Sequence, residues 1–147
     1  MPLDAMITSI IGGILATYVL LAMGAWSHRL GLPRLDFGKA MANLTFGESF
    51  EGREPPYFAG QAVVYMNGII FALLYSTVIA HYLPGPPVIK GMIWGIVLYL
   101  VSCMFYVPLY LREGFFLSKL HPMAWIPSAM VHGLYGIVVG CLCPIVP

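Results

Sequence analysis

Residues 61–111 have the sequence QAVVYMNGIIFALLYSTVIAHYLPGPPVIKGMIWGIVLYLVSCMFYVPLYL, and this stretch decides the fold. It contains two long apolar runs, 61–83 and 88–111, on either side of the tetrapeptide Pro84-Gly85-Pro86-Pro87. About 20 mostly apolar residues are enough to cross the hydrocarbon core of a bilayer as a helix. Three prolines and a glycine cannot continue a helix, so the tetrapeptide predicts a tight turn. The stretch therefore predicts an antiparallel pair of membrane-spanning helices.

Two further apolar runs of similar length lie outside this pair, at residues 7–26 and 124–143. None of the four runs contains Asp or Glu, and the only Lys or Arg in them is Lys90. Backbone groups in lipid must be hydrogen-bonded within their own segment, which favours helices over strands. The sequence predicts an all-α membrane protein, with four transmembrane helices in an antiparallel bundle that form a single domain over residues 1–147.

The composition agrees with lipid as the main solvent of this chain. It has 147 residues, of which 60% are hydrophobic and only 9% are charged. A soluble domain carries roughly 25% charged residues, because its surface faces water. The formal net charge of +1 argues against a nucleic-acid partner, which would require a basic patch. We expect the lipid bilayer itself to be the main partner.

Lysine and arginine are distributed unevenly between the two ends of the predicted bundle. Four lie in the first loop and two in the third, whereas Lys90 alone lies at the opposite end; the six are Arg29, Arg34, Lys39, Arg53, Arg112 and Lys119. Loops that remain in the cytoplasm carry an excess of Lys and Arg. This distribution predicts that loops one and three are cytoplasmic and that both termini lie on the other side.

The first loop contains a segment, residues 35–44, that has the pattern of a short helix. Asp36 is a suitable N-cap, and four apolar residues follow with helical spacing: Phe37, Ala40, Met41 and Leu44. A helix with one apolar face would lie in the membrane interface. The alternative is an ordinary connecting loop.

Each predicted span carries small residues at intervals of four, which allow helices in lipid to pack closely. The predicted packing residues are Gly13, Gly68, Ala72, Ser76, Gly91, Gly95, Gly136 and Gly140. These faces could close a compact four-helix bundle, or one of them could dock on another subunit. The spacing alone does not distinguish these two uses.

Two polar side chains inside the spans are candidate functional residues, because polar groups in a membrane are costly. His132 lies about 12 Å into the fourth span and Asn67 about 9 Å into the second, measured from the same surface. We expect the two side chains to be able to meet. One interpretation is a structural hydrogen bond that fixes the helix register. The other is a binding site for a haem, a pigment such as chlorophyll, or a quinone, with His132 as a ligand.

Neither a resident cofactor nor a catalytic site is predicted. A bis-histidine haem needs two histidines at matching depth, and no other histidine matches His132. Cys141 and Cys143 are too few and too isolated to predict a metal site. No serine or threonine in the spans has a carboxylate partner, so no catalytic residues are assigned. We expect a protein that is not an enzyme.

The chain resembles the small bacterial four-helix membrane proteins that are grouped under a domain of unknown function. The resemblance rests on four short motifs: residues 11–17 (IGGILAT), residues 31–36 (GLPRLD), residues 83–86 (LPGP) with Lys90-Gly91, and residues 132–136 (HGLYG). It covers nearly the whole chain and implies the four-helix fold. Because that family has no established activity, the resemblance implies nothing further about function.

The leading functional hypothesis is a non-catalytic accessory subunit of a larger membrane complex, such as a respiratory or photosynthetic electron-transfer assembly. This hypothesis is based on three features of the sequence: the chain is small, its spans carry several helix-packing faces, and no combination of catalytic residues is recognised. The partners would be other integral membrane subunits in a bacterial inner membrane. Two alternatives stay open: a small hydrophobic-ligand carrier that uses His132, and a small transporter or channel.

Overall fold

The computed structural model describes residues 1–47 and 55–146, which form helices and no strands. Four helical stretches in this part are long and apolar enough to cross a membrane: Leu3–Leu30, Tyr57–Tyr82, Pro87–Leu111 and Trp125–Leu142. The all-α, four-span prediction is therefore confirmed. Among the loop-one cations, Arg53 lies outside the described residues.

The first span consists of α1 (Leu3–Trp26) and a 3-10 turn, η1 (Ser27–Leu30). It ends at Gly31, whose φ of +75° is a left-handed conformation that glycine adopts without a steric penalty. The Ser27 hydroxyl lies 2.9 Å from the Gly24 carbonyl and 2.6 Å from the Pro33 carbonyl. These contacts hold the start of loop one against the end of the helix.

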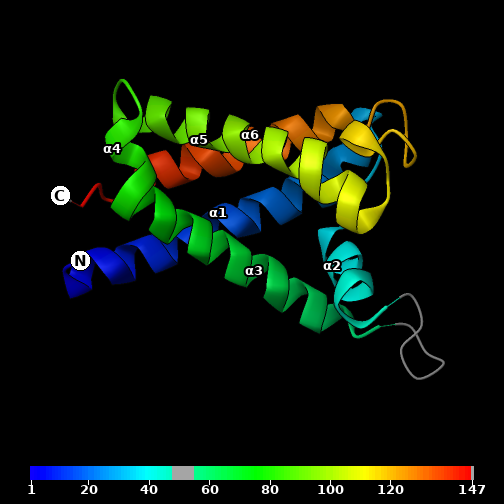
Figure 1. The fold of residues 1–147 in the computed structure, drawn as a ribbon, viewed down its shortest axis with the longest axis horizontal. Helices are drawn as coiled ribbons and strands as arrows, with labels where there is room; N and C mark the ends of the chain where they lie inside the picture. Colours follow the sequence, from blue (N-terminus) through cyan, green and yellow to red (C-terminus); the bar gives the residue numbers. More distant parts are fainter. Residues whose placement is uncertain (48–54, 147) are drawn as a thin grey trace.

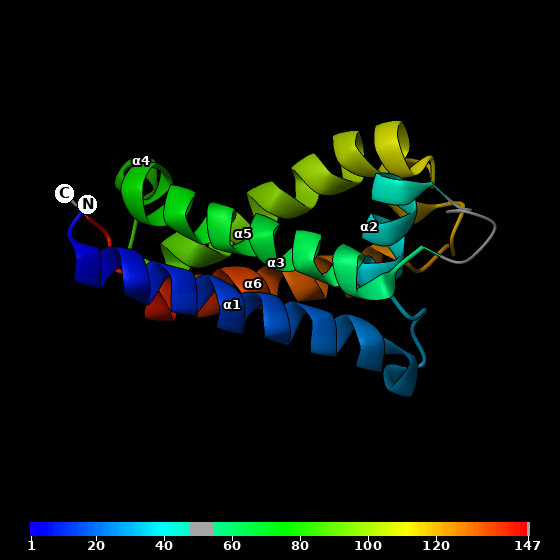
Figure 2. The same ribbon diagram turned by 90° about the horizontal axis from the view of Figure 1, so that it is seen from below.

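The predicted helix in loop one is present as α2 (Phe37–Phe46), and the Asp36 carboxylate caps it by accepting from the Lys39 N–H at 3.0 Å. The buried residues of α2 are Gly38, Met41 and Ala42, whereas Leu44 is exposed. The helix presents small residues to α3 (Tyr57–Leu74), where Gly60 allows backbone contact with Gly38 and Ala42. α2 lies across one end of the bundle (Figures 1 and 2).

The second and third spans form the predicted antiparallel hairpin. The second continues from α3 through a π-helical turn, η2 (Tyr75–Ile79), into the short α4 (Ala80–Tyr82). The third begins as α5 (Pro87–Val101), and Gly85 in the turn between them has a φ of +92°. The Lys90 ammonium donates to the Ala80 carbonyl at 2.7 Å. A cation at the carboxyl end of a helix is favourable, so this contact stabilises the hairpin.

The third span ends in a π-helical stretch, η3 (Ser102–Leu111), which contains Pro108. Proline has no N–H to donate, and its ring clashes with the carbonyl four residues before it. A wider helical turn relieves that clash, which explains the irregularity at this place. The Tyr106 hydroxyl of η3 contacts the Met41 sulfur of α2 at 3.2 Å, so α2 bridges α3 and η3.

Loop three contains a short 3-10 turn, η4 (Phe115–Leu117), and leads into α6 (Trp125–Leu142). Both termini and the turn between α4 and α5 lie at one end of the molecule, and α2 lies at the other (Figure 1). Loop three packs at the α2 end, where Leu35, Val107, Leu117 and Ala124 form a small buried cluster. The main core contains Tyr75, Trp94 and Tyr135.

Two pairs of helices pack through the small residues that the sequence singled out. Gly13 of α1 faces Gly68 and Ala72 of α3. Farther along the same span, the hydroxyl oxygens of Ser76 in η2 and Ser9 in α1 lie 2.8 Å apart in a hydrogen bond. In α5 and α6, Gly91 and Gly95 face the backbone of α6; the α6 residues at this contact are His132, Gly136 and Gly140. A Cβ added to any of these glycines would meet neighbouring atoms, so the close approach depends on them.

A buried tyrosine ties α6 to α3, and its removal is the first test of this packing. The Tyr135 hydroxyl donates to the Gly68 carbonyl at 2.6 Å. We expect Tyr135→Phe to lower the free energy of unfolding by about 1 kcal/mol, the usual value of an interhelical hydrogen bond in a membrane. Unfolding of the purified protein by SDS titration measures the change. Tyr110→Phe, at an exposed tyrosine of η3, should leave the midpoint unchanged; an equal loss in both variants would contradict the assignment.

Candidate functional site

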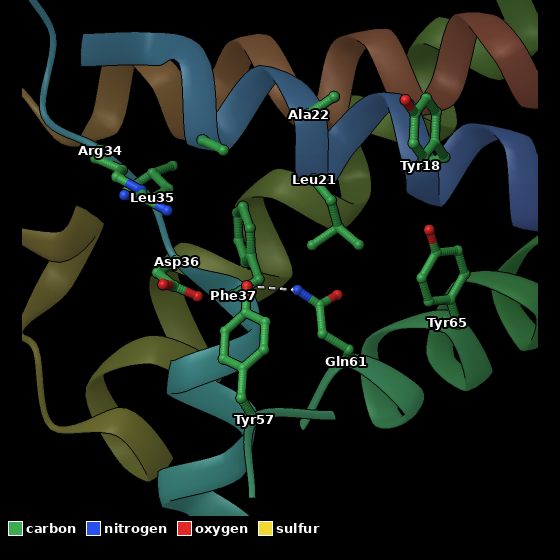
Figure 3. A pocket seen from close by; sticks show the side chains of 11 residues that line it. Tyr18, Leu21, Ala22, Arg34, Leu35, Asp36, Phe37, Tyr57, Gln61 and Tyr65 are labelled. Carbon is green, nitrogen blue, oxygen red and sulfur yellow. Dashed lines mark hydrogen bonds between the residues drawn. The ribbon is translucent and has the colours of Figure 1, made fainter. Parts of the chain in front are cut away.

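A crevice of about 340 Å³ lies between α1 and α3 near loop one (Figure 3). The two helices are in close contact where Gly13 and Thr17 meet Gly68. They diverge toward the end that carries α2 (Figure 1). Its polar lining residues are Tyr18, Arg34, Asp36, Tyr57, Gln61 and Tyr65. Its apolar lining residues are Leu21, Ala22, Ala25, Leu35 and Phe37.

The polar groups of the crevice come from three segments of the chain. The Gln61 amide donates to the Tyr57 hydroxyl at 2.6 Å, one helical turn away on α3. Figure 3 shows Tyr65 on α3 across the crevice from Tyr18 and Leu21 on α1. Arg34 contributes one positive charge from loop one and Asp36 one negative charge, so the lining is formally neutral. The described part of the site offers several neutral hydrogen-bonding groups and no excess charge.

Sequence reasoning did not identify this crevice. Tyr57, Gln61 and Tyr65 are not among the candidate functional residues predicted from the sequence. The available signal was the spacing of Tyr57, Gln61 and Tyr65 at i, i+4 and i+8, which places three hydrogen-bonding side chains on one face of a helix. The position of this face opposite Tyr18 depends on how α1 and α3 diverge, and the sequence pattern does not contain that information.

His132 lies behind one wall of the crevice. It is buried on α6, and its Nδ1 donates to the Ser128 carbonyl at 2.7 Å. The Phe37 ring, which lines the crevice, is edge-on to the imidazole with 6.5 Å between ring centroids, and Tyr99 of α5 lies at 6.0 Å. Within the described residues, none hydrogen-bonds the other ring nitrogen, Nε2. The imidazole is therefore held mainly by its own helix and by aromatic neighbours.

Asn67 does not meet His132. Its neighbour Gly68 is buried against Thr17, and consecutive residues of a helix point about 100° apart. Asn67 is exposed on the outside of α3 and has no hydrogen-bond partner among the residues that the structure describes. The expected pairing of the two side chains is thus not formed, because their depths are similar but their faces differ.

The cysteines at the end of α6 lie at the opposite end of the molecule from α2. Cys141 is exposed, whereas Cys143 is buried with its sulfur 3.9 Å from the Ser9 carbonyl oxygen. They line a shallow depression of about 410 Å³ together with Asp4 and Thr8. In residues 1–47 and 55–146, no group of three or more histidine, cysteine or acidic side chains is arranged to hold a metal ion.

Comparison with known proteins places the chain in one family. The sequence profile of a family of unknown function, DUF6789, matches residues 3–146. No curated protein and no solved structure matches the chain. The profile spans all four membrane helices, α2 and the crevice residues on α1 and α3. Because this match covers nearly the whole sequence, the chain belongs to the DUF6789 family of unknown function.

Proposed function

We propose that this protein is a non-catalytic accessory subunit of a larger membrane complex, and that Asn67 contacts a neighbouring subunit. Asn67 lies ten residues after Tyr57, or roughly 15 Å along α3, near the middle of a bilayer about 30 Å thick. Its carboxamide is exposed at this depth. Lipid tails cannot hydrogen-bond a carboxamide, and polar side chains of this kind join helices in membranes. A polar group on an adjacent helix would satisfy Asn67.

Two exposed threonines of the spans do not require a partner. Thr8 donates to the Asp4 carbonyl at 2.8 Å, and Thr77 donates to the Leu73 carbonyl at 2.8 Å. Each hydroxyl is satisfied by its own helix, which is the common arrangement for serine and threonine in helices. Asn67 differs from them because it has no such bond within the described residues. This contrast is the observation that supports an intersubunit contact.

The distribution of lysine and arginine supports an orientation for the subunit. Six of the seven Lys and Arg residues belong to loops one and three in the sequence, and the five of them that the structure describes lie at the end where α2 is placed. By the positive-inside rule, this end faces the cytoplasm and both termini lie on the other side. We place the protein in a bacterial inner membrane, in a complex of the respiratory or photosynthetic kind.

The test is recovery of partners from native membranes with matched variants. We expect the tagged wild type, extracted in a mild detergent, to bring down other membrane subunits in fixed stoichiometry, as measured by quantitative mass spectrometry. Asn67→Leu should reduce that recovery by roughly tenfold, since one interhelical hydrogen bond is worth about 1–2 kcal/mol. Thr77→Val, at an exposed threonine of the same span, should recover the subunits as the wild type does. Recovery of this chain alone, or equal recovery with Asn67→Leu, would contradict the proposal.

Two other functions stay predictions. A hydrophobic-ligand carrier would use His132 to hold a haem, a pigment or a quinone, and an absorption spectrum of the same sample with His132→Ala tests it. A small transporter or channel would conduct a solute, and a flux assay in liposomes tests that. Broken helices and buried charges are typical of transporters. The charged residues of the four spans, Asp4, Arg29 and Lys90, all lie near span ends.

A further inference from the structure

We propose that the crevice between α1 and α3 binds the uncharged head of a membrane quinone, with the tail of that molecule in the surrounding lipid. The inference does not depend on the accessory function or on His132, because none of its residues is Asn67 or His132. It rests on the position, the charge and the hydrogen-bonding groups of the crevice, and on the exposed apolar side chains beside it.

The crevice lies at the depth where the head of an amphiphile resides. At one end it is lined by Arg34 and Asp36 of loop one. At the other end it reaches Tyr18 and Tyr65, each eight residues from the loop-one end of its helix, or about 12 Å at 1.5 Å per residue. Its volume of about 340 Å³ is within the range of small-molecule sites, roughly 300–1,000 Å³. A single ring with short substituents would occupy it.

The hydrogen-bonding groups favour an uncharged head that accepts hydrogen bonds. The hydroxyls of Tyr18 and Tyr65 have no partner among the described residues. Gln61 uses one N–H for the Tyr57 hydroxyl, which leaves its second N–H and the Tyr57 O–H free to donate. A quinone carries two carbonyl acceptors on opposite sides of a planar ring. Donors on two facing helices, α1 and α3, provide one set for each carbonyl.

The aromatic side chains of the crevice suit a flat ring. Phe37 and Tyr57 form one side of the crevice in Figure 3, and Tyr65 lies farther along α3. Aromatic faces pack against planar rings in offset or edge-to-face contacts that stabilise binding beyond the area that they bury. A saturated polar head would not gain this stabilisation.

A path for an apolar tail begins where the crevice ends. Ile14 and Leu15 lie one turn from Tyr18 toward the middle of the bilayer, and both are exposed. Met66 on α3 is exposed beside Tyr65 at a similar depth. An isoprenoid chain leaving the crevice would therefore pass over apolar side chains into lipid.

A phospholipid head is the competing occupant, and the charges do not favour it. Among the described residues of the lining, Arg34 is the only cation, and Asp36 lies two residues from it with an opposite charge. Recognition of a phosphate usually uses clustered cations or bidentate arginine contacts without a nearby acid. The lining instead consists mainly of neutral donors and aromatic rings.

The experiment measures binding of ubiquinone-1, which has a single isoprene unit, to the purified full-length protein by isothermal titration calorimetry. A blank of matched detergent micelles removes the heat of partition. We expect one site per chain. Gln61→Leu and Tyr65→Phe should each weaken binding roughly tenfold, as expected for one lost hydrogen bond of about 1.4 kcal/mol. Ala22→Phe fills the crevice and should abolish binding.

Control variants separate a loss of binding at the crevice from a general loss of folded protein. Tyr110→Phe removes a hydroxyl outside the crevice and should bind as the wild type does. Tyr65→Phe removes a single oxygen and keeps the shape of the side chain, so it tests the site even if Ala22→Phe does not fold. Undiminished binding in Gln61→Leu and Tyr65→Phe would overturn the site. Displacement of ubiquinone-1 by dihexanoyl phosphatidylglycerol, with the same sensitivity to the variants, would overturn the quinone class and identify a phospholipid site.

Discussion

Gly136→Val is expected to separate α5 from α6 and to cause the largest loss of stability of any single substitution discussed. A Cβ at Gly136 would collide with the backbone oxygen of Gly91 and lie 2.9 Å from both the Cα and the N of Gly95. These are backbone atoms of a neighbouring helix, which cannot rotate aside as a side chain can. Overpacking typically costs about 1–3 kcal/mol. We expect at least about 3 kcal/mol here, because valine adds two further carbons beyond the Cβ.

The same helix provides a matched control, Gly133→Val. Gly133 lies three residues before Gly136, and a Cβ added there meets nothing within 4 Å. We expect Gly133→Val to change the free energy of unfolding by less than about 0.5 kcal/mol, as surface substitutions usually do. SDS titration followed by tryptophan fluorescence compares the two, since buried Trp94 of α5 becomes exposed when α5 leaves α6. Equal midpoints for the two variants would show that α5 and α6 do not pack through Gly136.

The packing residues could be predicted from the sequence, but the helices that they contact could not. Small residues four apart identified Gly91, Gly95 and Gly136 as packing positions, because close approach in lipid requires small side chains. The partner of each face depends on how four helices fill space together. Only the structure therefore shows that α5 meets α6 here and that α1 meets α3 at Gly68.

The expected pairing of Asn67 with His132 was wrong because it was inferred from depth alone. The angle around the helix is decided by a glycine contact: Gly68 packs against Thr17 and turns Asn67 outward. Apolar pattern is a weak guide to such angles in a membrane, where the lipid-facing side of a helix is also apolar.

The crevice could not have been predicted for a related reason. Tyr18, Gln61 and Tyr65 belong to two different helices, and their approach depends on the divergence of α1 and α3 from the Gly68 contact. Spacing along one helix identifies residues that share a face. It does not identify which side chains of another helix lie opposite.

The second large effect is expected from Gly60→Val, which should release α2 while the four spans remain packed. A Cβ at Gly60 would overlap the Gly38 carbonyl and lie 2.6 Å from the N and 2.9 Å from the Cβ of Ala42. α2 contributes no membrane span, so its loss leaves the α1–α3 and α5–α6 contacts intact. When α2 is released, Phe37 moves away from both the wall of the crevice and the imidazole of His132. We therefore expect Gly60→Val also to weaken any binding in the crevice.

Thiol labelling distinguishes this local release from global unfolding. In a background of Cys103→Ser and Cys141→Ser, which leaves Cys143 as the one native thiol, Met41→Cys places a second thiol on the buried face of α2. We expect Gly60→Val to increase maleimide labelling at position 41 roughly tenfold or more, because local opening exposes that face. Cys143, buried at the far end of the bundle, should stay protected. Ala62→Val, at an exposed position of α3, is the control and should leave both thiols protected. Labelling of Cys143 together with position 41 would mean instead that α2 is an integral part of the bundle and that the four spans do not hold without it.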